Sequence, residues 1–155
     1  MAAIGWEKNK HSKTKGQAGE VLFRFACMSQ GYVPHTPDGD PPCHDLVVMN
    51  PANGRCKVTQ VKAIGYRSLC RADRKDYSYK VMAKCKNRKV HLRDSIVDIL
   101  AAYVIDEKAW YLVPVQQITG TNMSLRPHIA GRKGKYEKYR ERWSVFGRGV
   151  TPLDI

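Results

Sequence analysis

Two pairs of short apolar segments, each joined by a brief polar turn, constrain the fold of this chain more than any other feature. Residues 45–49 (DLVVM) and 55–64 flank the turn NPANG at residues 50–54, whose Asn-Gly step favours a hairpin. Residues 96–105 (IVDILAAYVI) and 110–113 (WYLV) form the second pair. The run 96–105 is long enough for a helix, but the strand-like partner that follows favours a buried strand. The two pairs predict a sheet.

A helix is predicted before these hairpins, continuing to about residue 29. Thr14 and Gln17 fit a capping box, in which the hydroxyl and the amide close the first helical turn. Apolar side chains recur at helical spacing along this segment and are expected to face the core. They are Val21, Leu22, Phe25, Ala26 and Met28. Glu20 lies at the edge of this stripe, so its carboxylate is expected at the margin of the core.

The remaining segments are predicted from their turn residues and their charge. Residues 34–44 contain four Pro and one Gly and predict a loop. Residues 77–82 predict a further strand, and residues 119–134 predict a loop. A basic helix is expected at about residues 134–148. No repeat or linker interrupts the chain, so residues 1–155 are expected to form one domain.

The composition is that of a folded protein. Of the 155 residues, 43% are hydrophobic and 26% are charged, which excludes a chain that is disordered throughout. No apolar run approaches the roughly 18 residues of a membrane span. The Lys-rich start also lacks the apolar centre of a signal peptide. We therefore expect an intracellular protein with no membrane partner.

The cysteines give no sign of a disulfide framework or a zinc ribbon. The chain has five, an odd number, and none lies in a CxxC pair. Cys43 and His44 are adjacent, but a structural zinc site normally needs two spaced pairs of ligands. All five cysteines are therefore expected to be reduced thiols.

The net charge of +13 is segregated along the chain. Residues 1–15 form a basic arm, residues 16–54 are net acidic, and residues 55–93 carry thirteen Lys and Arg. An acidic segment between basic flanks suits a metal-dependent nuclease, because carboxylates hold the cation while Lys and Arg hold the phosphates. The residues expected to contact nucleic acid are Lys13, Lys15, Arg67, Arg71, Arg74, Lys75, Lys84, Lys86, Arg88, Arg132, Lys133 and Lys135.

Four residues are candidates for catalysis: Glu20, Asp45, Gln60 and Lys62. Asp45 opens one strand, and Gln60 and Lys62 share one face of its hairpin partner, because side chains alternate along a strand. Oxygen donors of this kind suit Mg²⁺, with Asp45, Gln60 and Glu20 as its expected ligands. Lys62 would then orient or help to deprotonate the attacking water. The alternative is a structural Lys–Asp pair on a half-buried sheet.

These residues resemble the PD-(D/E)XK nuclease superfamily, whose αβββαβ core carries a Glu on a helix, an Asp that opens a strand and a (D/E)-x-Lys on the next strand. The resemblance is strongest to the endonucleases associated with group I introns. It rests on KGQAGE at 15–20, GYVP at 31–34, PDGD at 37–40, HDLVV at 44–48, QVK at 60–62, VDILA at 97–101 and WYLVP at 110–114.

The resemblance implies a restriction-endonuclease-like α/β (α+β) fold, with a mixed central sheet flanked by helices. It implies a Mg²⁺-dependent DNA endonuclease of the sequence-specific homing type, in which Mn²⁺ is expected to substitute for Mg²⁺. The partner is then double-stranded DNA, and cutting both strands implies a homodimer or a homotetramer. The alternatives are a nuclease similar to Holliday-junction resolvases and a DNA-binding module without catalysis.

Two positions depart from the superfamily pattern. His44 stands where the Pro of the superfamily name would precede Asp45, and the nearest prolines are Pro41 and Pro42. Gln60 stands where most members have a carboxylate. A glutamine offers a neutral carbonyl oxygen, which can still bind Mg²⁺, although more weakly. The intron-associated group tolerates Gln at this position, and this favours an active enzyme over a degenerate one.

Overall fold

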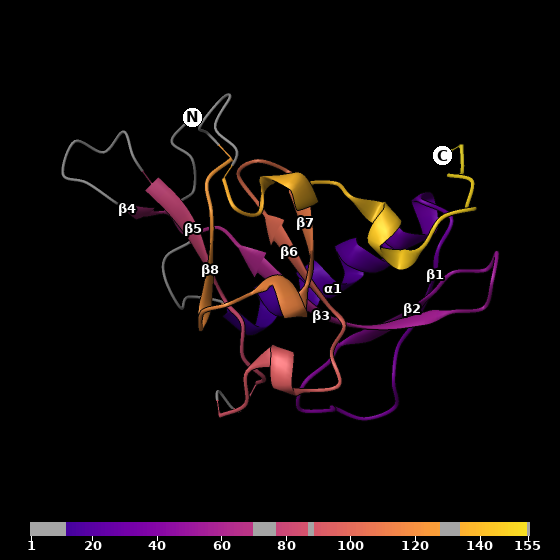
Figure 1. Cartoon of the computed structure of the whole chain (residues 1–155), viewed down its shortest axis with the longest axis horizontal. Coiled ribbons are helices and arrows are strands. Elements are labelled where there is room, and N and C mark those ends of the chain that lie inside the picture. The colour runs from indigo at the N-terminus through magenta and orange to yellow at the C-terminus, as the bar shows by residue number, and fades with distance from the viewer. Residues whose placement is uncertain (1–11, 70–76, 87–88, 128–133, 155) are drawn as a thin grey trace.

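The computed structural model describes residues 12–69, 77–86, 89–127 and 134–154 (Figure 1). One α-helix and eight strands are formed in this part of the chain, together with four short 3-10 turns. The helix is α1 (Ser12–Ser29). The strands are β1 (Val33–His35), β2 (Leu46–Met49), β3 (Cys56–Ile64), β4 (Ser68–Leu69), β5 (Tyr77–Met82), β6 (Ile99–Val104), β7 (Ala109–Pro114) and β8 (Asn122–Leu125). The turns are η1 (Leu92–Asp94), η2 (Val115–Gln117), η3 (Glu137–Tyr139) and η4 (Trp143–Phe146).

Five strands form a mixed sheet in the order β1-β2-β3-β6-β7. β2 and β3 are an antiparallel hairpin in which Leu46 faces Thr59, and β6 and β7 are a second antiparallel hairpin. The two hairpins join through parallel pairing of β3 with β6, in which Gln60 faces Leu100. Both predicted hairpins are therefore confirmed, and so are the strand at residues 96–105 and the mixed-sheet fold class.

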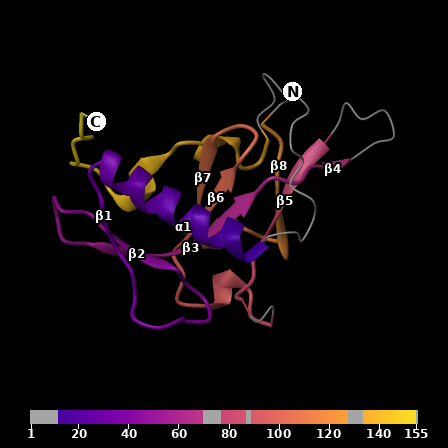
Figure 2. The same ribbon diagram turned by 180° about the vertical axis from the view of Figure 1, so that it is seen from behind.

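Helix α1 crosses one face of this sheet (Figure 2). Phe23 and Cys27 are fully buried there, beside Trp110 of β7. Gly19 permits the close approach of the helix to β3, because a Cβ added at Gly19 would lie 3.1 Å from the Cβ of Ala63. The helix therefore presents the next residue, Glu20, at the edge of β3.

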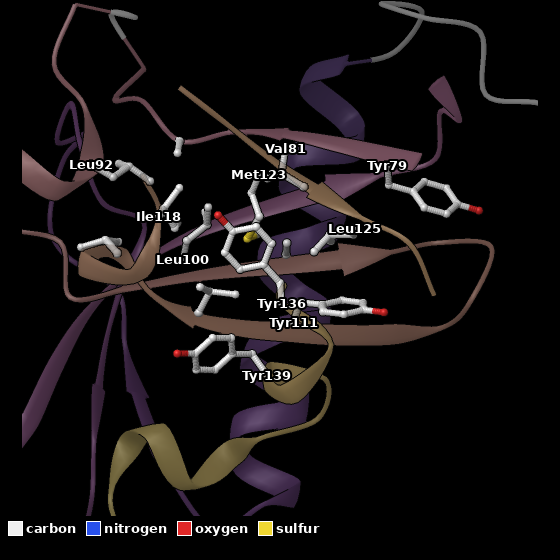
Figure 3. Close-up of a cluster of buried hydrophobic side chains, with 14 of the residues drawn as sticks. Tyr79, Val81, Leu92, Leu100, Tyr111, Ile118, Met123, Leu125, Tyr136 and Tyr139 are labelled. Carbon is white, nitrogen blue, oxygen red and sulfur yellow. The ribbon is translucent and has the colours of Figure 1, made fainter. Parts of the chain in front are cut away.

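The opposite face of the sheet is covered by β5 and β8, which belong to the small sheet β4-β5-β8, and by the loops around them (Figure 3). Side chains from β5, β7 and β8 pack there against alternate residues of β6, including Leu100 and Val104. Ile99 and Ala101 of the same strand face α1 instead. Strand β6 is buried on both faces, which explains its continuous apolar sequence.

The predicted apolar stripe of the helix was wrong. Val21, Leu22, Phe25 and Met28 are 65%, 45%, 56% and 45% exposed, and Ala26 is half-buried. The buried row is Gly19, Phe23 and Cys27 instead, because the helix packs on β3 through its glycine. The predicted cap was also wrong, since the helix begins at Ser12 and Thr14 lies inside it.

Three further expectations are corrected. Strand β1 lies partly within the predicted loop 34–44, and its proline is tolerated because β1 is an edge strand. Strand β8 lies within the predicted loop 119–134. Residues 134–148 do not form a helix within their described part but two 3-10 turns. Glu141 separates these turns with a φ of 49°, a conformation outside the helical region.

The expectation that all cysteines are reduced was also wrong. Cys43 and Cys85 form a disulfide, with their Cα atoms 4.5 Å apart. Cys27 is a buried free thiol and Cys56 an exposed one, whereas Cys70 lies outside the described residues. Two cysteines far apart in the sequence give no local signal of pairing. Within residues 12–69, 77–86, 89–127 and 134–154, no helix is long and apolar enough to span a membrane.

Candidate active site

The four predicted catalytic residues lie together in one cavity of about 600 Å³. Glu20 comes from α1, Asp45 directly precedes β2, and Gln60 and Lys62 lie on β3. The cavity opens where the β2–β3 hairpin meets the N-terminal half of α1. Three further lysines also line it: Lys15, Lys80 and Lys86.

Asp45 is held rigidly at this site. Its Oδ2 accepts a hydrogen bond from the Gln60 side-chain amide and another from the Val61 backbone N–H, each at 2.7 Å. Its own backbone N–H donates to the Thr59 carbonyl at 3.0 Å and so extends the hairpin ladder. With Oδ2 engaged twice, Oδ1 is the oxygen that Asp45 offers to a cation.

Gln60 presents a buried oxygen without a hydrogen-bond donor. The residue is 1% exposed, and within the described part of the chain no donor reaches its Oε1. Leaving a buried amide oxygen unsatisfied costs about 1–3 kcal/mol. The Gln60 amide nitrogen donates to Asp45, so the amide oxygen is left without a donor from the described residues and could accept contact from a bound ligand.

Glu20 is half-buried at the same cavity. Burial raises the pKa of its carboxyl group above the usual value of 4.5, and the nearby charge of Asp45 raises it further, while Lys86 acts in the opposite direction. A divalent cation between Glu20 and Asp45 would offset this repulsion.

The donor set fits a divalent cation of the Mg²⁺ type. Asp45 and Glu20 supply carboxylate oxygens, and the unsatisfied Oε1 of Gln60 supplies a carbonyl oxygen. Among the described residues, no group of three or more His, Cys, Asp or Glu side chains is arranged to hold a metal. Asp45 and Glu20 are two residues of these types, and the third oxygen donor is the Gln60 amide.

Lys86 makes contacts with two carboxylates that the sequence did not reveal. It was predicted to contact phosphate, but its ammonium donates a hydrogen bond to Asp40 and lies 3.4 Å from Asp45 Oδ1. Burial opposes the charge of this ammonium, yet the contacts with Asp40 and Asp45 outweigh it and raise the pKa of Lys86. The hydrogen bond from Lys86 in turn lowers the pKa of the Asp40 carboxyl.

The other predicted nucleic-acid contacts are spread over several surfaces. Lys13 and Lys15 lie on α1 near the cavity, and Lys84 is half-buried. Arg67 pairs with Asp106 at 3.2 Å, so its charge is partly neutralised. Lys135 donates to Thr119 at 2.8 Å. The rest lie outside the described residues: Arg71, Arg74, Lys75, Arg88, Arg132 and Lys133.

Comparison with known proteins indicates the family of this chain. The sequence pattern of the PD-(D/E)XK endonuclease family matches residues 10–146. Among solved structures, the chain is similar to the bacterial homing endonuclease I-Ssp6803I, with 25% identity and a TM-score of 0.69, over 88% of this chain and 93% of that one. No curated protein matches significantly. The chain therefore belongs to the PD-(D/E)XK endonuclease family.

Proposed function

We propose that this protein is a Mg²⁺-dependent DNA endonuclease that hydrolyses phosphodiester bonds. The observation that carries the proposal is the unsatisfied Oε1 of Gln60, buried beside the carboxylate of Asp45 in a cavity that Glu20 and Lys62 also line. A purely structural polar cluster would satisfy its own buried atoms. Here, one buried amide oxygen has no partner among the residues that the structure describes.

Each residue has a distinct part in the proposed reaction. Asp45, Glu20 and Gln60 would hold Mg²⁺, or Mn²⁺ in its place. The bound ion would offset charge on the scissile phosphate and favour deprotonation of the attacking water. Lys62 would orient that water through its ammonium and counter the charge that develops on the phosphate oxygens. The two hydrogen bonds to Asp45 Oδ2 fix the carboxylate before DNA arrives, so little reorganisation is needed.

The proposed substrate is double-stranded DNA, cut at a specific sequence. The net charge of +13 supports a polyanionic substrate, and the similarity to a homing endonuclease supports sequence-specific cutting. The basic arm 1–15 and the lysines of the cavity wall would contact the phosphates on either side of the scissile bond. Affinity is then expected to fall steeply with salt concentration.

We also propose that the active form is a symmetric dimer or tetramer, because cutting both strands requires two active sites. The exposed stripe Val21, Leu22, Phe25 and Met28 on α1 supports this, since a contiguous apolar surface is unfavourable in water. Phe25→Lys should then lower the sedimentation coefficient. An unchanged coefficient would contradict the use of this surface.

The direct test of function is cleavage of plasmid DNA. Supercoiled plasmid that contains the target region should be nicked or linearised with Mg²⁺ or Mn²⁺ and left intact with EDTA. A protein that shifts the plasmid in a gel but leaves it uncut with either ion would contradict the proposal and indicate a binding module.

A further inference from the structure

The Lys86 ammonium lies among carboxylates at the place where the proposed cation would bind. It donates to Asp40, lies 3.4 Å from Asp45 Oδ1, and its charge affects the Glu20 carboxyl. Asp45 Oδ1 is also the oxygen left available for the ion, because Oδ2 accepts the two hydrogen bonds from Gln60 and Val61. The ammonium and a divalent ion would therefore compete for the same atom.

The backbone at Lys86 is anchored to the segment that leads into Asp45. The Lys86 N–H donates to the Pro42 carbonyl at 2.9 Å. The preceding residue, Cys85, is joined to Cys43 by the disulfide. Cys43 in turn lies two positions before Asp45. Lys86 is thus linked to the segment before Asp45 at two points, the hydrogen bond to Pro42 and the disulfide of its neighbour Cys85. The backbone therefore holds the Lys86 side chain near Asp45.

We propose that Lys86 is a positioning residue that competes with the divalent ion for Asp45 Oδ1, and that DNA removes this competition. The inference rests on the proposed function of the same site. Without DNA, the ammonium keeps the carboxylates of Asp45 and Asp40 together and disfavours the ion. When a DNA phosphate reaches the cavity, it attracts the ammonium away from Asp45, since a phosphate is a strong acceptor for a charged donor. Metal binding and DNA binding are then coupled.

This coupling has a defined thermodynamic consequence. If DNA strengthens metal binding, the metal must strengthen DNA binding by the same factor. The side chain of Lys86 is 37% exposed, so it can reach a ligand in the cavity without unfolding its surroundings. An enzyme built in this way holds little metal until its substrate is bound.

The test is calorimetric titration of Mg²⁺ into the protein alone and into its complex with an uncleavable duplex. In wild type, the duplex should tighten Mg²⁺ binding by about tenfold or more, within the usual range of coupling between sites. Lys86→Met should bind Mg²⁺ about fivefold more tightly than wild type without DNA. The tightening caused by the duplex should shrink by a similar factor.

Three matched variants isolate the effect. Lys86→Gln removes the charge with a polar side chain and should behave like Lys86→Met, so it serves if the methionine disturbs folding. Lys86→Arg keeps the charge and should keep the coupling. Lys80→Met removes a charge from the same cavity wall, on an exposed residue of β5, and should change Mg²⁺ affinity in the absence of DNA by less than about twofold.

The outcomes separate the two proposals. If Lys86→Met and Lys86→Gln bind Mg²⁺ as wild type does, with the wild-type response to DNA, the role of Lys86 is wrong and the proposed function stands. If wild type binds no Mg²⁺ with or without the duplex, the proposed function itself is wrong. An effect of Lys80→Met equal to that of Lys86→Met would also overturn the specific role of Lys86.

Discussion

Two buried side-chain amides lie at opposite ends of the β2–β3 hairpin, and the fold treats them differently. Asn50 follows β2 at the turn end and is fully buried. Its Nδ2 donates to the carbonyls of Phe146 and Arg148 at 3.4 and 3.0 Å. Its Oδ1 accepts from the backbone N–H of Ala52 at 2.9 Å. This amide is satisfied on both sides and fixes the C-terminal segment to the hairpin.

Gln60, at the cavity end, is almost as deeply buried but only half satisfied. Its Nε2 donates to Asp45 at 2.7 Å, while no donor in the described part of the chain reaches its Oε1. Proteins rarely leave such atoms unpaired unless a ligand or a functional constraint is involved. Asn50 therefore has the contacts expected of a group that stabilises the fold, whereas Gln60 has those that we propose for a ligand site.

The largest expected effect concerns the carboxylate beside Gln60. Asp45→Asn keeps an oxygen that can accept the Val61 hydrogen bond but removes the negative charge from the cavity. Cleavage should fall at least about 10³-fold, which corresponds to about 4 kcal/mol of transition-state stabilisation. Lys62→Ala should have a comparable effect. Single-turnover cleavage measures both, and a gel-shift titration should show that DNA binding survives.

A matched control for these variants is Asp38→Ala, which removes an exposed carboxylate from the loop that precedes Asp45. It should cut DNA at the wild-type rate. Wild-type cleavage by Asp45→Asn or Lys62→Ala would mean that the catalytic site lies elsewhere.

Gln60 itself should show the second-largest effect. Gln60→Ala removes the unsatisfied oxygen and should slow cleavage by about 10- to 100-fold, the range expected when support for a metal site is lost. Gln60→Glu supplies a charged oxygen and should retain cleavage or tighten Mg²⁺ binding. Single-turnover cleavage and Mg²⁺ titrations, with and without an uncleavable duplex, would compare the three forms. Wild-type activity in Gln60→Ala would make the glutamine an ordinary strand residue.

Replacing Asn50 should lower the stability of the fold and leave the cleavage activity unchanged. Asn50→Ala removes the donor of two backbone carbonyls, at a cost of about 2 kcal/mol. For a chain of this size, that corresponds to a fall in melting temperature of about 4–8 °C. The folded fraction should still cut DNA at the wild-type rate. Asn53→Ala, which removes an exposed acceptor in the same turn, should change stability by less than about 0.5 kcal/mol.

The sequence predicted which candidate residues lie together better than it predicted the elements around them. Asp45, Gln60 and Lys62 were placed correctly in one cavity because strand alternation and the short hairpin turn are local rules. The parallel pairing of β3 with β6, which joins the two hairpins, is a non-local contact and was not predicted. Glu20 was expected at the margin of the core and is half-buried there, although the helix face predicted to be buried is exposed.

The failures have physical reasons. The helix face was misjudged because one glycine, Gly19, decides which side approaches β3, while the exposed stripe carries more apolar side chains. The segment predicted as a basic C-terminal helix instead buries Tyr139 and Trp143 in two separate 3-10 turns. Lys86 was assigned only to phosphate binding because the contact with Asp45 is non-local.

The smallest expected effect is a difference in cysteine reactivity between the two ends of the hairpin. At the turn end, Cys56 opens β3 as an exposed thiol and should react with iodoacetamide in the native protein without reductant. At the cavity end, Cys43 and Cys85 should react only after reduction, because they are bonded to each other. Peptide mass spectrometry after alkylation distinguishes these sites, and labelling of Cys43 or Cys85 without reductant would contradict the disulfide.

Cys27, on the buried face of α1, should resist the same reagent for a different reason. Burial raises the pKa of its thiol from 9.0 to about 12, so almost no thiolate forms at pH 8. The unfolded chain releases this proton near pH 9 and the folded chain only near pH 12. The contribution of Cys27 to stability is therefore fully present below pH 9 and is lost as the pH rises toward 12. Denaturant titrations of wild type and Cys27→Ala across this range should show a steeper loss in wild type, and parallel curves would contradict the raised pKa.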